Sequence, residues 1–170
     1  MSKLILIVGL TGAGKTTYSD EESVREKAVI YSIDRMMKSL FWGDMPERPD
    51  MNWFVENQKW YTDRITRCED FIEGEIAKLA KLGISCILDL GFTSQAHRHK
   101  YISMAKEHGM KPEVHFLDIP LDVRWKRVEK RNDEKSKTYS MDVSREMFDY
   151  METIFEPLSE LEKTLLVQHI

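Results

Sequence analysis

The 170-residue sequence has little cysteine, and it lacks an apolar run long enough to cross a bilayer. Its two cysteines, Cys68 and Cys86, do not have the spacing of a disulfide framework. Cys86 stands inside an apolar run, so we expect both thiols to be reduced and structural. A bilayer span needs about 20 apolar residues, and the start of the chain has no small-residue cleavage site. The sequence therefore predicts a cytoplasmic protein that does not insert into a membrane.

An excess of positive charge is also missing. The 25 Lys and Arg residues stand against 29 Asp and Glu residues, which gives a formal net charge of −4. This balance argues against a protein whose main task is to coat nucleic acid, because positive charge supplies most of the affinity for phosphate backbones. A local basic patch could still serve an acidic substrate. The chain also lacks internal repeats and low-complexity linkers, and its length suits one domain.

What the sequence does contain is a glycine-rich segment near its start. Residues 9–16 read GLTGAGKT and fit the Walker A pattern G-x-x-x-x-G-K-[ST]. The segment follows the apolar run 4–8, which is typical of a buried strand, and precedes a stretch that can begin a helix. Such glycines let the backbone wrap a polyphosphate, while Lys15 reaches the outer phosphates and the Thr16 hydroxyl can ligate Mg²⁺. We therefore predict binding of ATP with Mg²⁺, through Gly9, Thr11, Gly12, Ala13, Gly14, Lys15, Thr16 and Thr17.

Five short apolar runs predict the fold class. They are separated by longer amphipathic stretches and cover residues 4–8, 28–33, 85–90, 114–117 and 164–168. Runs that are apolar on both faces suit a parallel sheet with helices on each side. Helices are expected between them, at 95–108, 123–130, 143–155 and in the second half of the stretch before 82. The alternation predicts a three-layer α/β fold with a five-stranded parallel sheet and the nucleotide at the carboxyl ends of the strands.

Two classes of Walker A protein fit the rest of the sequence poorly. A GTPase should carry an Asn-Lys-x-Asp motif, and the sequence has none. A ring-forming ATPase usually has an acidic pair after its third strand, but Asp89 is followed by Leu90 and Gly91. A phosphotransferase instead needs an acceptor-side carboxylate, a magnesium ligand and a cationic lid over the triphosphate.

The sequence offers a carboxylate for each of the first two tasks. Asp34 follows the second predicted strand, where it could accept the proton of an acceptor hydroxyl or orient that hydroxyl. It could also simply cap the next helix. Asp89 ends the third strand and is placed to hold Mg²⁺ through water, although an aspartate there can also be a solvated turn residue.

The lid candidate is the basic stretch that begins at Leu121. Arg127 and Arg131 are four residues apart, so on a helix they share a face and could reach one polyphosphate together. A solvated helix with intrahelical ion pairs is the alternative. On the first interpretation the catalytic residues are Lys15, Asp34 and Arg127.

With these features the sequence resembles the small P-loop kinases that include the 5′-kinase domain of polynucleotide kinase, zeta-type toxins and chloramphenicol phosphotransferase. The resemblance covers nearly the whole length. It rests on the Walker A loop and on YSIDR at 31–35, ILD at 87–89, Arg98, FLDIP at 116–120, Arg127, Arg131-Asn132 and FEP at 155–157.

This resemblance implies a single P-loop kinase domain over residues 1–170, with a helical acceptor-side insertion at about 35–82 and a lid at about 121–141. It also implies that Asp34 acts as the base and that Arg127 and Arg131 clamp the triphosphate. The sequence departs from these kinases at Met37 and after Asp89, where relatives often carry an arginine and a small polar residue. Both departures affect the acceptor side.

The acceptor itself is left open by the sequence. Arg35 and Arg98 are the predicted substrate-binding residues, and the aromatic residues of the insertion could either stack on an acceptor or pack between helices. We expect transfer of the γ-phosphate to a hydroxyl of a small molecule or of a nucleic-acid end. A polynucleotide 5′-hydroxyl kinase and a non-catalytic ATP-binding regulator are the alternatives. No obligate protein partner is evident.

Overall fold

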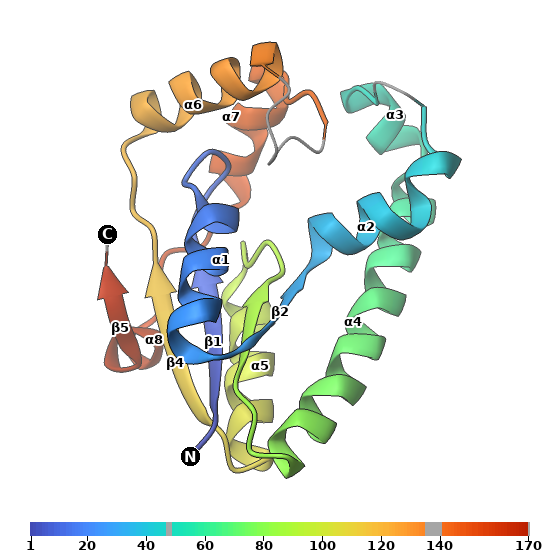
Figure 1. Cartoon of the computed structure of the whole chain (residues 1–170). Helices are drawn as coiled ribbons and strands as arrows, with labels where there is room; N and C mark the ends of the chain where they lie inside the picture. Colours follow the sequence, from blue (N-terminus) through green and yellow to red (C-terminus); the bar gives the residue numbers. More distant parts are fainter. Residues whose placement is uncertain (47–48, 135–140, 170) are drawn as a thin grey trace.

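The computed structural model describes residues 1–46, 49–134 and 141–169 (Figure 1). Its five strands are all parallel and form one sheet in the order β2-β3-β1-β4-β5. The strands are β1 (Lys3–Val8), β2 (Val29–Ser32), β3 (Cys86–Asp89), β4 (Lys111–Phe116) and β5 (Leu166–His169). The predicted α/β fold with a five-stranded parallel sheet is confirmed.

Helices cover both faces of this sheet, as the apolar runs require. Alternate residues of β1 pack in opposite directions, with Leu4 and Leu6 in the cluster that includes α4 and α5, and Ile5 and Ile7 in the cluster beside Tyr18 of α1. The helices are α1 (Lys15–Glu26), α2 (Ile33–Phe41), η1 (Trp42–Asp44), α3 (Met51–Glu56), α4 (Gln58–Lys81), α5 (Gln95–Glu107), α6 (Leu121–Glu134), α7 (Arg145–Ile154) and α8 (Glu160–Thr164).

The first half of β4 is absent from the predicted strand. The apolar run begins at Val114, but pairing with β1 begins at Lys111. Glu113 is buried on this strand, and its carboxylate accepts ion pairs from Lys111 at 2.8 Å and Lys3 at 3.4 Å. A charged residue can occupy a buried strand position when oppositely charged side chains pair with it. A search for apolar runs does not detect such a strand position, so the prediction missed residues 111–113.

Helices α2, α3 and α4 occupy most of the stretch between β2 and β3. The 24-residue helix α4 packs against the sheet through Cys68, Ile72 and Ile76, at the helical spacing that the sequence predicts. Cys68 and Cys86 are both buried and unpaired. Within the described residues, no helix is both long enough and apolar enough to span a membrane.

A buried ion pair fixes the C-terminal part of the chain to the sheet layer. The Arg98 side chain of α5 is fully buried, and it donates to the Glu162 carboxylate of α8. The same guanidinium donates to the carbonyls of Thr93, Glu156 and Pro157 at 2.9–3.3 Å. Arg98 therefore connects α5, the loop after β3 and the segment that leads into α8.

This ion pair predicts an acid-sensitive contribution to stability. Burial alone would raise the pKa of Glu162, but hydrogen bonds from Arg98 and Ser159 outweigh it and lower that pKa below its ordinary value. A carboxyl with a lowered folded-state pKa stabilises the fold at neutral pH, and this contribution is lost as the pH falls below about 4. We expect Glu162→Gln to lower the free energy of unfolding at pH 7 by about 3–5 kcal/mol, because it leaves the Arg98 charge buried without its counter-ion.

Urea denaturation from pH 7 to pH 3 measures both effects. The Glu162→Gln protein should lose less stability over this range than the wild type. Glu160→Gln is the matched control, since Glu160 pairs with Lys163 on the surface of the same helix, and it should change stability by less than about 1 kcal/mol. Equal effects of the two substitutions would contradict the proposed importance of the buried pair.

Candidate active site

The loop between β1 and α1 has the backbone of an anion site. Gly12 and Gly14 have φ angles of 81° and 92°, which only glycine adopts readily. Helix α1 begins after Gly14 without a side-chain cap. The first backbone N–H groups of a helix have no intrahelical partner, and they carry the positive end of the helix dipole. The loop therefore fits a bound polyphosphate.

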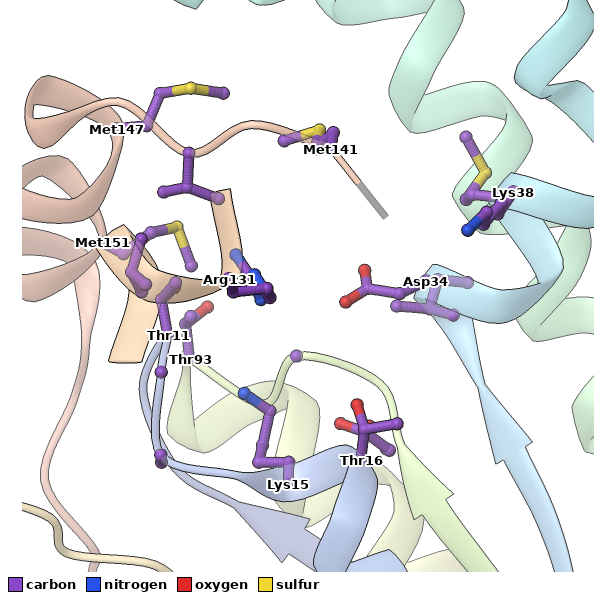
Figure 2. A pocket seen from close by; sticks show the side chains of 18 of the residues that line it. Thr11, Lys15, Thr16, Asp34, Lys38, Thr93, Arg131, Met141, Met147 and Met151 are labelled. Carbon is purple, nitrogen blue, oxygen red and sulfur yellow. The ribbon is translucent and has the colours of Figure 1, made fainter. Parts of the chain in front are cut away.

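A cavity of about 1250 Å³ opens above this loop, at the carboxyl ends of the strands (Figure 2). Its walls are the loop itself, the α2–α4 stretch on one side and the α6–α7 stretch on the other. The cavity brings together most of the predicted site residues, namely Thr11, Gly12, Ala13, Gly14, Lys15, Thr16, Thr17, Asp34, Asp89, Arg127 and Arg131. Gly9 is not among the lining residues. A Cβ at that position would lie 3.1 Å from the carbonyl oxygen of Leu117, so Gly9 permits a close approach of two loops below the cavity.

Asp34 lies in the first turn of α2, and its carboxylate points into the cavity opposite Arg131, with Lys15 and Thr16 below it (Figure 2). The N-cap position of this helix is occupied by Ser32, so Asp34 is not the capping residue. Tyr61 of α4 lies near this carboxylate: burial, with the negative charge of Asp34 added to it, raises the pKa of Tyr61 to about 12. Asp34 is therefore available to a molecule bound in the cavity.

Asp89 ends β3 and is almost fully buried at the base of the cavity. Burial raises the pKa of its carboxyl, the charge of Lys15 opposes this rise, and the charge of Asp34 adds to it. In the described part of the chain, no three His, Cys, Asp or Glu residues gather in a metal-binding group. A Mg²⁺ ion at this place would consequently need phosphate oxygens among its ligands, with the Thr16 hydroxyl and the Asp89 carboxylate beside it.

Helix α6 carries the predicted lid arginines and is docked on the glycine loop. Arg127 donates to the carbonyl oxygen of Ala13 at 3.3 Å, and Arg131 points into the cavity (Figure 2). A Cβ at Gly12 would lie only 2.5 Å from the backbone carbonyl oxygen of Arg124. The close approach of α6 therefore depends on glycine at position 12. The predicted lid range extends to 141, and its residues 135–140 lie outside the described part of the chain.

Arg124 connects the lid to the glycine loop, a role that the sequence did not single out. It is almost fully buried and donates to the carbonyl of Thr11 at 3.4 Å. Its guanidinium also binds both carboxylate oxygens of Glu152 on α7, at 2.6 and 2.8 Å. The spacing 124, 127, 131 places the three arginines along one side of a helix. This spacing is the feature of the sequence from which the role of Arg124 could have been predicted.

The two predicted substrate-binding arginines are not in the cavity, and their assignment is corrected here. Arg35 is half exposed and donates to both carboxylate oxygens of Asp20 on α1 at 2.8 Å. Arg98 is buried in the ion pair with Glu162. Neither lines the cavity. The cation of α2 that does line it is Lys38, one turn after Asp34.

The close contact between Gly12 and α6 predicts that adding one methyl group at position 12 will weaken ATP binding. Gly12→Ala places a Cβ against the backbone of α6 and also imposes a strained φ on alanine. We expect it to weaken ATP binding at least tenfold in calorimetry, because either the loop or the lid must move. Gly109→Ala is the matched control, since Gly109 has a φ of 66° but no atom within 4 Å of the added Cβ. Gly109→Ala should lose about 1–2 kcal/mol of stability from its strained φ alone, and Gly12→Ala should lose more, because its Cβ also meets the backbone of α6. Unchanged ATP affinity in Gly12→Ala would refute the packing argument.

The Arg124 contacts predict that its shape matters as well as its charge. Arg124→Lys keeps the charge but cannot bind both oxygens of Glu152 while reaching Thr11. We expect the free energy of unfolding to fall by about 1–3 kcal/mol in urea titrations. Arg145→Lys offers a comparison on α7, where an exposed arginine binds both oxygens of Asp149, and it should cost less than about 1 kcal/mol. The reverse ranking would show that Arg124 does not hold the lid.

Comparisons with known proteins agree with this architecture. A family described as an AAA domain matches residues 4–158. A search of curated proteins gives no match. Among solved structures, the Pnkp1/Rnl/Hen1 RNA repair complex contains a similar chain, with 20% identity and a TM-score of 0.67 over 96% of this chain. The match spans 45% of that longer chain, so this protein corresponds to less than half of it.

Two further structures match over nearly the whole of this chain and more than four fifths of their own. A gluconokinase from Sinorhizobium meliloti 1021 has 12% identity and a TM-score of 0.64, over 99% of this chain and 81% of its own. Kti12 from Chaetomium thermophilum, solved in complex with ADP-AlF3, has 14% identity and a TM-score of 0.62, over 99% and 88%. At these identities the likeness concerns the fold, and it confirms the expected P-loop fold of the kinase type.

Proposed function

This chain belongs to the AAA domain family, and on that premise we propose that it is a phosphotransferase that moves the γ-phosphate of ATP to a hydroxyl group with the help of Mg²⁺. One observation carries the proposal: a single cavity is lined by the glycine loop, by the Asp34 carboxylate and by two lid arginines. A nucleotide-binding regulator needs the loop, but it has no use for a carboxylate that faces the outer phosphates.

The nucleotide side of the proposal assigns a role to each cavity residue. The loop amides and Lys15 hold the β- and γ-phosphates. Thr16 and Asp89 would hold Mg²⁺, and the ion would neutralise charge on the phosphate oxygens. Arg127 exchanges the carbonyl of Ala13 for a phosphate oxygen, and a hydrogen bond between two charged groups is the stronger of the two. Arg131 reaches the same phosphates from the next turn of α6.

The acceptor side of the proposal rests on Asp34. The hydroxyl oxygen of the acceptor attacks the γ-phosphorus in line with the bond to the bridging oxygen. A new P–O bond forms, the bond to the bridging oxygen breaks, and ADP leaves with that electron pair. The Asp34 carboxylate orients the hydroxyl and takes its proton. The product is a phosphate monoester of the acceptor.

Substitution of Asp34 tests this assignment. We expect Asp34→Asn to lower the transfer of labelled γ-phosphate by about 10²–10⁴-fold, measured over a panel of oligonucleotides, sugars and simple alcohols. The Kd for ATP should change less than tenfold, because the amide is close to the carboxylate in size and the glycine loop is untouched.

Asp20→Asn is the control for this substitution. Asp20 is an exposed aspartate on α1 whose partner is Arg35, so the variant should retain full transfer. Full transfer by Asp34→Asn would remove Asp34 from the chemistry. A wild type that binds ATP but transfers phosphate to no acceptor would instead favour the non-catalytic regulator.

A further inference from the structure

We infer that the acceptor is a small alcohol with a largely apolar, aromatic body, and that it binds between α3–α4 and α7 beside Asp34. This inference deepens the proposed phosphotransferase function and rests on it. Two independent features of the cavity support it: the side chains that line its outer part, and the small number of cations on the wall that α2, α3 and α4 form.

Methionine is concentrated on the cavity walls. Six of the ten methionines of the chain line this one cavity, and three of them, Met141, Met147 and Met151, lie on the lid side (Figure 2). The others come from the α2–α3 side and are Met37, Met45 and Met51. Methionine side chains are flexible and polarizable, and their sulfur atoms make favourable contacts with aromatic rings. Walls of this kind suit a flat apolar body.

Aromatic residues of the insertion take part in helix packing, and some of them also line the cavity. Phe54 and Tyr61 line the cavity and pack edge to face, with ring centroids 5.1 Å apart. Trp60 lies outside the lining and packs against the core that includes α4 and α5. Phe54, together with Met51 of α3, also packs against the cluster of Val128, Val143, Met147 and Phe148 on the lid side. The aromatic side chains of α3 and α4 and the methionines of α7 therefore line the same apolar part of the cavity. Such surfaces bind rings through offset and edge-to-face contacts.

The wall of the cavity formed by α2, α3 and α4, here called the acceptor wall, has few positive charges, because the arginines of this region and of α5 bind other partners. Arg35 binds Asp20, and Arg98 binds Glu162. Arg64 of α4 lies 3.7 Å from the centroid of the Trp60 ring and donates to the Trp60 carbonyl. Within the described part of α2–α4, Lys38 is the one Lys or Arg that lines the cavity.

This distribution of charge separates the candidate acceptors. A polynucleotide needs several Lys or Arg contacts along its phosphates. The α2–α4 wall offers one, and the other cations that line the cavity, Lys15, Arg127, Lys130 and Arg131, come from the glycine loop, the start of α1 and α6, where the triphosphate of ATP is proposed to bind. A polyol or sugar needs a hydrogen-bonding partner for each buried hydroxyl, and the uncharged polar side chains of this wall are those of Gln58, Tyr61 and Thr62. The Thr62 hydroxyl already donates to the carbonyl of Gln58 at 2.9 Å. An apolar alcohol with a single hydroxyl near Asp34 leaves the fewest groups unpaired.

A homologous series of alcohols tests the inference. We would measure transfer of labelled γ-phosphate from ATP to benzyl alcohol, 2-phenylethanol and 3-phenylpropanol, and in parallel to D-gluconate, ribose and a 5′-hydroxyl oligonucleotide. We expect the phenylalkanols to be phosphorylated, with kcat/KM rising up to about fourfold for each added methylene that is buried. The sugar, the sugar acid and the oligonucleotide should be at least a hundredfold poorer acceptors.

A pair of methionine substitutions locates the site. Met51→Gln adds a polar amide to the acceptor wall, and we expect it to raise the KM for 3-phenylpropanol at least fivefold without changing the Kd for ATP. Met104→Gln is the matched control, because Met104 is half-buried on α5 and does not line the cavity. An equal rise of KM in both variants would overturn the location.

Binding measurements distinguish a failure of this inference from a failure of the proposed function. Better transfer to the oligonucleotide or to a sugar than to the phenylalkanols would overturn the acceptor class and leave the phosphotransferase intact. Bound 3-phenylpropanol in calorimetry, without transfer to any acceptor, would support the ligand class and refute the catalytic function. Absence of 3-phenylpropanol binding in a protein that binds ATP would overturn the inference outright.

Discussion

The arrangement of this site depends on the close approach of two backbones, that of the glycine loop and that of helix α6. A side chain at position 12 would meet the carbonyl of Arg124, so the missing side chain of Gly12 admits the lid. Arg124 and Arg127 then bind carbonyl oxygens of Thr11 and Ala13. The loop is consequently held through carbonyl oxygens, which a bound phosphate would not use.

Features that depend on neighbouring residues could be predicted from the sequence, whereas features that depend on distant partners could not. The glycine loop and the strand that feeds it are adjacent in the chain, so spacing alone revealed them. Arg98 is expected near the substrate from the family resemblance, and no local pattern reveals its partner Glu162, which lies 64 residues away. The assignment of Arg35 to the substrate is wrong for the same reason, since nothing in the local pattern connects Arg35 with Asp20. An arginine looks alike in a sequence whether a ligand or a buried carboxylate binds it.

The cavity divides into a charged half and an apolar half, and the two halves come from different parts of the chain. Lys15, Asp89 and Arg127 come from the end of the glycine loop, the central sheet and α6, and they line the part of the cavity where we propose that the phosphates bind. The α3–α4 and α7 walls contribute mainly methionine and aromatic side chains. A net charge of −4 is compatible with the proposed function, because a few well-placed cations can stabilise one phosphate group without a basic surface.

In a phosphotransferase, water competes with the acceptor for attack on the γ-phosphate. Apolar walls on the acceptor side would reduce this hydrolysis by excluding water. Asp34 could activate a water molecule as readily as an alcohol, and the carboxylate alone does not discriminate between them. Methionine and aromatic side chains offer water few hydrogen bonds, so an apolar acceptor displaces it at little cost. If these walls bind the acceptor as we propose, they would also limit hydrolysis. The methionines of α7 would contribute only while α7 stays docked through Glu152 and Arg124.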